Sequence, residues 1–196
     1  MSAEQIRERY ARIVEAAGPG VTIVAATKYV SVADLAVLAD AGIPVVGENR
    51  AQDLERKHAE YGDAFRWHFI GRLQSNKVKV VNRICELVHS LESESAARKL
   101  TIPALIEVNL SGEASKGGVD RDELPRLLEL AEVRGLMTMP PEAEDPETSR
   151  PYFRRLRDLA EQHGLAQLSM GTSQDWQVAI EEGATHVRIG SVLYRD

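Results

Sequence analysis

A lysine closes the first strongly apolar run of the chain, residues 21–28. An amine carried to the end of a buried strand, with apolar neighbours before it, loses part of the hydration that favours its ammonium form. Such an amine can act as a nucleophile toward an aldehyde, so Lys28 could do Schiff-base chemistry. The alternative is an ordinary lysine that marks the solvent-facing end of a strand.

Two segments near the C-terminus carry glycine and serine where strands are expected to end, residues 168–173 and 187–191. A helical segment from Gln174 to Glu182 lies between them. In a (β/α)8 barrel the loops after strands seven and eight commonly bind phosphate, because backbone N–H groups and a helix N-terminus point at the anion. A lysine, a phosphate cradle and an arginine, Arg188, together suggest pyridoxal phosphate.

The elements that must position these residues are indicated by eight apolar runs with helix-length segments between them. We expect strands near 21–27, 43–47, 67–70, 86–91, 103–110, 133–138, 166–170 and 185–189. The intervening segments repeat apolar residues at helical spacing, as at Leu124, Leu127 and Leu128. This alternation predicts an α/β fold, a single (β/α)8 TIM-type barrel domain over residues 1–196. An N-terminal helix over 3–17 would fill the place of an eighth helix, and a doubly wound open sheet is the alternative.

In such a barrel the strand ends meet on one face, where active sites of this fold lie. The residues expected there are Lys28, Glu48, Asn49, Gly71, Asn109, Met137, Ser173 and Gly190. Asn49 could instead cap a helix. His68 is expected to be a satisfied core histidine rather than a general base, and Lys116 a solvated lysine unless it faces a cofactor. The acidic stretch 140–147 is expected to be a rim loop, with a lid as the alternative.

Composition excludes several classes of protein. With 43% hydrophobic residues, 196 residues can bury a core, and a net charge of −6 argues against a nucleic-acid surface. The single cysteine, Cys85, excludes an internal disulfide and is expected to be a buried small hydrophobe. The N-terminus is charged rather than signal-like, and no run approaches the about 20 apolar residues that span a bilayer. We expect a soluble, cytoplasmic monomer that binds neither nucleic acid nor membrane.

The chain resembles the pyridoxal phosphate homeostasis proteins over essentially its whole length. The most specific segment is 68–77, which reads His-Phe-Ile-Gly-x-Leu-Gln-x-Asn-Lys. Further matching segments occur in the same order at 27–28, 46–49, 107–110, 115–119, 134–137, 168–171 and 187–190. The resemblance implies a single barrel, similar to the N-terminal domain of alanine racemase, that holds pyridoxal phosphate as an internal aldimine.

Roles for individual residues follow from this resemblance. Lys28 matches the aldimine lysine, and Arg188 matches the arginine beside the pyridine nitrogen. Ser173, Gly190 and Ser191 match phosphate-loop positions that supply a hydroxyl or backbone N–H donors, and Asn49 matches a residue near the ring. The chain departs from many relatives at Val30, where they carry a second lysine, so a relay through that amine is absent here.

The resemblance and Arg188 together predict binding without turnover. A guanidinium next to the pyridine nitrogen disfavours its protonation and weakens the ring as an electron sink. The expected role is that of a non-catalytic carrier that holds the aldehyde reversibly and passes it to apoenzymes. The alternatives are a small amino-acid racemase, with His68 and Tyr29 as weak candidates for a second base, or a cofactor-free Schiff-base aldolase.

Overall fold

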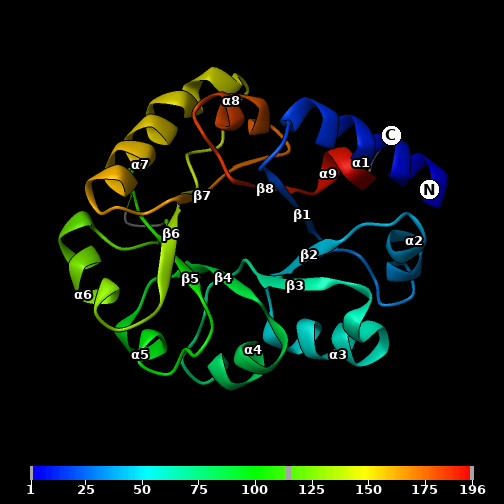
Figure 1. Cartoon of the computed structure of the whole chain (residues 1–196), viewed down its shortest axis with the longest axis horizontal. Helices are drawn as coiled ribbons and strands as arrows, with labels where there is room; N and C mark the ends of the chain where they lie inside the picture. The colour runs from blue at the N-terminus through cyan, green and yellow to red at the C-terminus, as the bar shows by residue number, and fades with distance from the viewer. Residues whose placement is uncertain (1, 114–115, 195–196) are drawn as a thin grey trace.

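Eight parallel strands pair in chain order, and β8 pairs with β1 so that the sheet closes into a barrel (Figure 1). The computed structural model of the chain describes residues 2–113 and 116–194. The strands are β1 (Thr22–Ala26), β2 (Val45–Glu48), β3 (Arg66–Phe69), β4 (Leu87–Leu91), β5 (Ala104–Glu107), β6 (Val133–Met137), β7 (Gln167–Thr172) and β8 (His186–Ile189). The predicted barrel is confirmed, and the open-sheet alternative is wrong.

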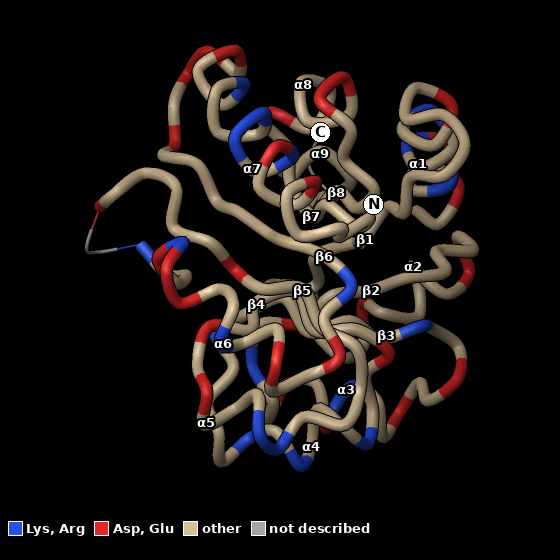
Figure 2. Tube along the Cα trace, turned by 60° about the vertical axis from the view of Figure 1, so that its left-hand side comes forward, with Lys and Arg blue, Asp and Glu red and all other residues tan. Residues whose placement is uncertain are grey.

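Helices surround the barrel on its outside (Figure 1). They are α1 (Ala3–Ala17), α2 (Leu35–Asp40), α3 (Ala51–Tyr61), α4 (Val78–Ile84), α5 (Glu94–Ala97), α6 (Leu124–Leu128), α7 (Arg150–Gln162), α8 (Trp176–Glu181) and α9 (Ser191–Tyr194), with 3₁₀ turns η1 (Gly62–Ala64), η2 (Arg121–Glu123) and η3 (Pro146–Ser149). In the view of Figure 2, basic and acidic residues are mixed along the outer helices α3, α4 and α5. None of the described helices is long and apolar enough to span a bilayer.

The first helix has the bounds that the sequence predicts. Ser2 and Gln5 form a capping box, which satisfies amides that the first turn leaves free. One face of α1 is buried through Ile6, Ile13 and Ala17, and the helix packs against α2, α8 and α9. It therefore covers the sheet beside β8, where only the four-residue α9 follows within the described chain.

The core has two regions of different polarity. Between the strands and the helices lies a continuous apolar layer. A small separate cluster contains Leu87, Leu105 and Met137. His89 on β4 contacts Ser169 on β7 although these strands are not neighbours, so the contact crosses the barrel interior. The interior is thus partly polar, whereas barrels of this type are commonly filled by branched apolar side chains.

One loop prediction can be compared with the structure. The acidic stretch 140–147 is a loop up to its last two residues, which begin η3. Ser115 and the terminal Arg195 and Asp196 lie outside the described residues.

Candidate functional site

The predicted site residues follow four strands that are neighbours in the barrel. Lys28 comes after β1, Asn49 after β2, Ser173 after β7 and Gly190 after β8, while Arg188 lies within β8. Because the strand order around the seam is β7-β8-β1-β2, the carboxyl ends of these strands are adjacent. A Cβ placed on Gly190 would lie 3.8 Å from Cβ of Ala26, which shows how closely the ends of β8 and β1 approach.

Lys28 is exposed at this end of the barrel. Its Nζ lies 4.9 Å from the ring centroid of Tyr29, which is itself 86% exposed. The desolvation expected for this amine is therefore wrong for the protein alone. The backbone just before Lys28 is nonetheless fixed, because Thr27 is buried and its N–H donates to the carbonyl of Gly47 at 3.0 Å.

A buried ion pair, which the sequence analysis did not predict, lies directly behind that strand end. Nζ of Lys57 is 2.5 Å from Oε1 of Glu48, and both side chains are almost completely buried. Lys57 Nζ also donates to the carbonyl of Thr27 at 2.7 Å, and the Thr27 hydroxyl donates to Glu48 Oε1 at 2.5 Å. This network connects β1, β2 and α3, so it holds the backbone that presents Lys28.

Asn49 is not a helix cap. Helix α3 begins at Ala51, and Arg50 occupies the cap position without a side-chain hydrogen bond. Oδ1 of Asn49 is instead buried and finds no hydrogen-bond partner among the described residues. A Cβ on Gly71 would lie 2.3 Å from the Asn49 carbonyl oxygen, so glycine is needed where the ends of β2 and β3 approach. A buried polar atom that the described residues leave unpaired needs a partner from elsewhere, which a bound ligand or a water can supply.

The loops after β7 and β8 form a cradle of donors. Oγ of Ser173 accepts hydrogen bonds from the N–H groups of Gly190 at 3.0 Å and Val192 at 3.4 Å. Val192 was not predicted, and the amide of Ser191 is not one of these two donors. The turn itself is held by Asp175, whose carboxylate accepts from the Thr172 N–H at 2.7 Å.

Arg188 is buried in the barrel, with 6% of its surface exposed. One terminal nitrogen donates to the Ser169 carbonyl at 3.0 Å and to the Ser169 hydroxyl at 2.5 Å. The other donates to the Thr138 carbonyl at 3.1 Å and lies 2.9 Å from Sδ of Met139. Burial lowers the pKa of Arg188 to about 10, so the side chain stays a cation near neutral pH.

Two histidines continue from Ser169 across the barrel. The Ser169 hydroxyl lies 2.7 Å from Nδ1 of His89, and Nε2 of His89 lies 2.9 Å from Nδ1 of His68. Burial lowers the pKa of His68 to about 3 and that of His89 well below its usual range. His68 is a core histidine, as expected, but it is not fully satisfied, because no residue in the described part of the chain bonds its Nε2.

These positions weaken both candidates for a second catalytic base. With its low pKa, His68 is a poor proton acceptor. Tyr29 is almost fully exposed beside Lys28. Cys85 is buried and free, as expected, and burial raises the pKa of its thiol, so it is not a ready nucleophile.

Lys116 lies near the predicted site, on the side of the end of β7 and the loop after β6. It lines a cavity of about 170 Å³ together with the proline-rich loop after β6 and with Thr172 and Asp175. The sequence left open whether this lysine is solvated or faces the site, and the structure places it beside the end of β7.

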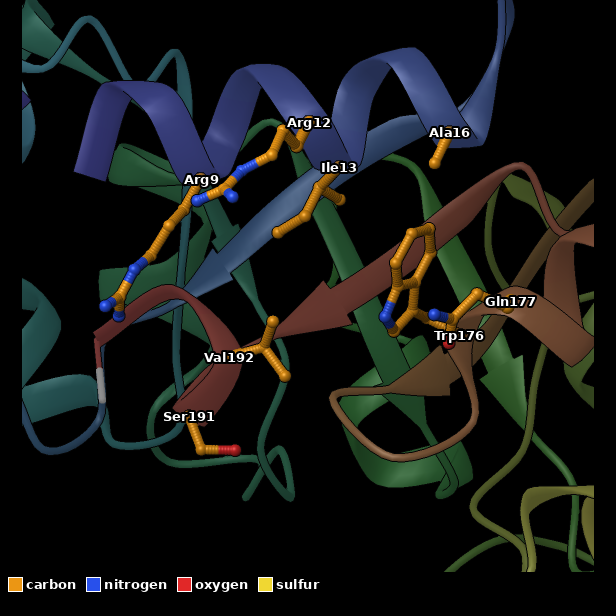
Figure 3. Close-up of a pocket in the computed structure, with 8 residues that line it drawn as sticks. All are labelled: Arg9, Arg12, Ile13, Ala16, Trp176, Gln177, Ser191 and Val192. Carbon is orange, nitrogen blue, oxygen red and sulfur yellow. The ribbon is translucent and has the colours of Figure 1, made fainter. Parts of the chain in front are cut away.

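A wider groove of about 770 Å³ lies on the outer side of the barrel between α1, α8 and α9. Figure 3 shows Arg12 and Ile13 of α1, Trp176 of α8 and Val192 of α9 around it. Of the six predicted residues, Ser191 is the one that lines this groove. Helix α9 therefore has two sides: its Val192 N–H faces the Ser173 hydroxyl, and its outer surface faces the groove.

Comparison with known proteins gives consistent matches over the whole chain. The alanine racemase N-terminal domain family matches residues 1–196. A pyridoxal phosphate homeostasis protein of Aquifex aeolicus is 42% identical, with 97% of this chain and 94% of the relative covered. That of Pseudomonas aeruginosa is 38% identical, with 98% and 94% covered.

Solved structures agree with this result. PipY of Synechococcus elongatus, solved with pyridoxal phosphate bound, has a TM-score of 0.85 and 32% identity, with 97% of this chain and 100% of PipY covered. Alanine racemase of Corynebacterium glutamicum has a TM-score of 0.76 at 18% identity, with 99% of this chain and 61% of the racemase covered. The second likeness concerns the fold alone.

Proposed function

Since this chain belongs to the pyridoxal phosphate homeostasis proteins, within the alanine racemase N-terminal domain family, we propose that it binds pyridoxal phosphate at the mouth of the barrel and holds it reversibly for delivery to apoenzymes. The observation that carries the proposal is the arrangement around the β7-β8-β1-β2 seam. There a lysine, a pair of amides focused on one oxygen and a buried arginine come from adjacent strand ends.

The residues present fit the phosphate group. The amides of Gly190 and Val192 already converge on an oxygen, that of Ser173. A phosphate oxygen is a stronger acceptor than a hydroxyl and would satisfy these donors, with the Ser173 hydroxyl then free to donate as well. Ser191 lies between these two amide positions in the chain, and Asn49, whose buried Oδ1 has no hydrogen-bond partner among the described residues, would lie near the ring.

Lys28 would hold the aldehyde. Its amine would condense with the carbonyl carbon, with a C=N bond in place of the C=O bond and release of one water, so that the cofactor would be held as an aldimine that hydrolysis reverses. The exposure of Lys28 suits a carrier, because another amine can reach the same carbon. When bound, the cofactor supplies this aldehyde and an electron-accepting ring.

Arg188 supports a role in binding rather than turnover. Its charge is permanent near neutral pH and would disfavour a proton on the ring nitrogen. The two groups considered as a second base are a weakly basic buried histidine and an exposed tyrosine. A protein of this kind stores the cofactor and returns it chemically unchanged.

Borohydride trapping tests the attachment. We expect reduction of the protein loaded with pyridoxal phosphate to fix the cofactor on the peptide that contains Lys28, as mapped by mass spectrometry. Lys28→Ala should lose the label, whereas the matched control Lys116→Ala should keep it. Label on Lys116 with none on Lys28 would contradict the proposal.

Exchange of the α-proton of amino acids in deuterated buffer tests the lack of turnover. A single positioned acid or base contributes about a hundred- to ten-thousandfold. If the protein has no such positioned group, the exchange rate measured by NMR should stay close to the rate with free pyridoxal phosphate. Rapid exchange of alanine that disappears in Lys28→Ala would favour a racemase instead.

A further inference from the structure

Arg188 is a buried cation whose close partners are neutral. Its hydrogen bonds go to two carbonyls, a hydroxyl and a thioether. Among the described residues Glu107 and Asp175 act on it only at longer range, and neither forms an ion pair with it. Its positive charge is therefore not cancelled by a contacting carboxylate, and neutral dipoles must stabilise it.

Behind Arg188 a chain of hydrogen bonds runs through Ser169 and His89 to His68. Only one direction of donation along this chain gives the buried Ser169 hydroxyl proton an acceptor. A guanidinium can only donate, so the Ser169 oxygen accepts from Arg188. Among the described residues, the one other partner of that hydroxyl is Nδ1 of His89, which must then accept the hydroxyl proton. The opposite direction would leave the buried Ser169 hydroxyl proton without an acceptor.

The tautomers of both histidines follow from this direction. Neutral His89 with Nδ1 as acceptor carries its proton on Nε2 and donates to Nδ1 of His68. His68 then carries its proton on Nε2, the atom that has no partner in the described structure. All three donors in the chain point away from Arg188, and their aligned dipoles polarise the Ser169 oxygen that faces the guanidinium.

We propose that Ser169 and His89, with His68 behind them, are positioning residues that hold Arg188 in the place and orientation from which its charge acts on the ring nitrogen of the bound cofactor. This inference rests on the proposed function. It assigns a role to side chains in the barrel interior that do not themselves lie at the mouth.

The test compares two ligands, pyridoxal phosphate and its analogue in which carbon replaces the ring nitrogen. The affinity for pyridoxal phosphate divided by the affinity for the analogue measures how strongly the protein interacts with the ring nitrogen. Ser169→Ala should reduce the ratio by roughly two- to tenfold, less than the roughly ten- to a hundredfold for loss of a hydrogen bond between a charged group and the ligand itself, because Arg188 keeps its bonds to the Ser169 and Thr138 carbonyls. It should also shift the pH dependence of the absorption spectrum of bound pyridoxal phosphate.

Three further variants separate positioning from folding. Ser169→Thr keeps the hydroxyl and should restore the ratio. Ser90→Ala is the matched control, because Ser90 is also buried and its hydroxyl donates to the Gly71 carbonyl, away from Arg188; it should leave the ratio unchanged. His89→Leu should shift the ratio in the same direction as Ser169→Ala, and it decides the matter if Ser169→Ala does not fold.

The outcomes distinguish the inference from the function on which it rests. If the wild type does not bind pyridoxal phosphate, the proposed function fails. If the wild type binds and the folded Ser169→Ala and His89→Leu variants keep the wild-type ratio, the positioning role fails while the proposed function stands.

Discussion

Single residues at the barrel mouth differ in how visible they are in the sequence. The sequence predicts that Ser173 and Gly190 share an anion-binding loop, because glycine and serine at strand ends are typical of such loops, and the structure brings the two residues into hydrogen-bond contact. Ser169 was not, since its partner His89 is 80 positions away in the chain and no local spacing connects the two. Lys57 lies in a helix rich in charged residues, where a solvated lysine is the normal interpretation. In the structure it is buried together with its ion-pair partner Glu48.

At the residue scale, Ser173→Ala should weaken binding of pyridoxal phosphate much more than binding of pyridoxal. Loss of one hydrogen bond to a charged group costs about 1.5–3 kcal/mol, or roughly ten- to a hundredfold in affinity. Fluorescence or absorbance titration with both ligands measures the difference. Ser111→Ala, which changes a serine bonded to Asn109 after β5, is the control and should affect neither ligand. Equal weakening of both ligands would show that Ser173 does not contact the phosphate.

At the scale of elements, the strands were predictable in number and order but less so at their ends. The run 103–110 reads as one long strand, yet β5 ends at Glu107 and Val108 forms only an isolated bridge with Val119. The glycine in β7 suggested a loop, but the strand continues to Thr172, which pairs with Arg188. Apolar sequence marks burial, whereas strand ends depend on the partner strand.

The Glu48–Lys57 pair gives a prediction for the junction of β1, β2 and α3. Lys57→Met should lower the free energy of unfolding by about 3–5 kcal/mol, because it leaves a buried carboxylate without its partner. The double variant Glu48→Leu/Lys57→Met should be less destabilised than Lys57→Met alone. Urea unfolding measures both.

The exposed pair Arg83–Glu55 is the control for this experiment. Its side chains are 61% and 52% exposed, so Arg83→Met should change stability by less than about 1 kcal/mol. The single variant Glu48→Leu is measured as well. If the loss of unfolding free energy in the double variant equals the sum of the losses in Glu48→Leu and Lys57→Met, Glu48 and Lys57 do not interact.

For the whole molecule, the polar interior makes stability depend on pH. Burial lowers the pKa of His68 to about 3 and of His186 to about 4, and lowers that of His89 as well. The unfolded chain therefore binds more protons than the folded one below about pH 6.5. Stability from these groups is present above that pH and is lost as pH falls toward their folded values.

The closed barrel was predictable from the alternating pattern, but its polar interior was not, since single histidines within apolar runs do not reveal one another.

Each of these histidines should contribute about 1.4 kcal/mol per pH unit to this loss. Urea unfolding at a series of pH values between 7.5 and 5 measures the slope of unfolding free energy against pH. His186→Gln should reduce this slope by the contribution of one histidine. His163 is exposed at the end of α7, so His163→Gln should leave the slope unchanged. A wild-type slope in His186→Gln would mean that burial of His186 does not affect its protonation.

The pairing of β8 with β1 has a consequence for the timing of synthesis. A ribosome makes β1 early and β8 late, so the barrel of a nascent chain stays open until β8 has left the exit tunnel. Lys28 is translated long before the amides that face Ser173, and the two meet only when the seam closes. An unfinished polypeptide therefore has Lys28 but not the pair of amides that bond Ser173, so the binding proposed above requires the completed barrel.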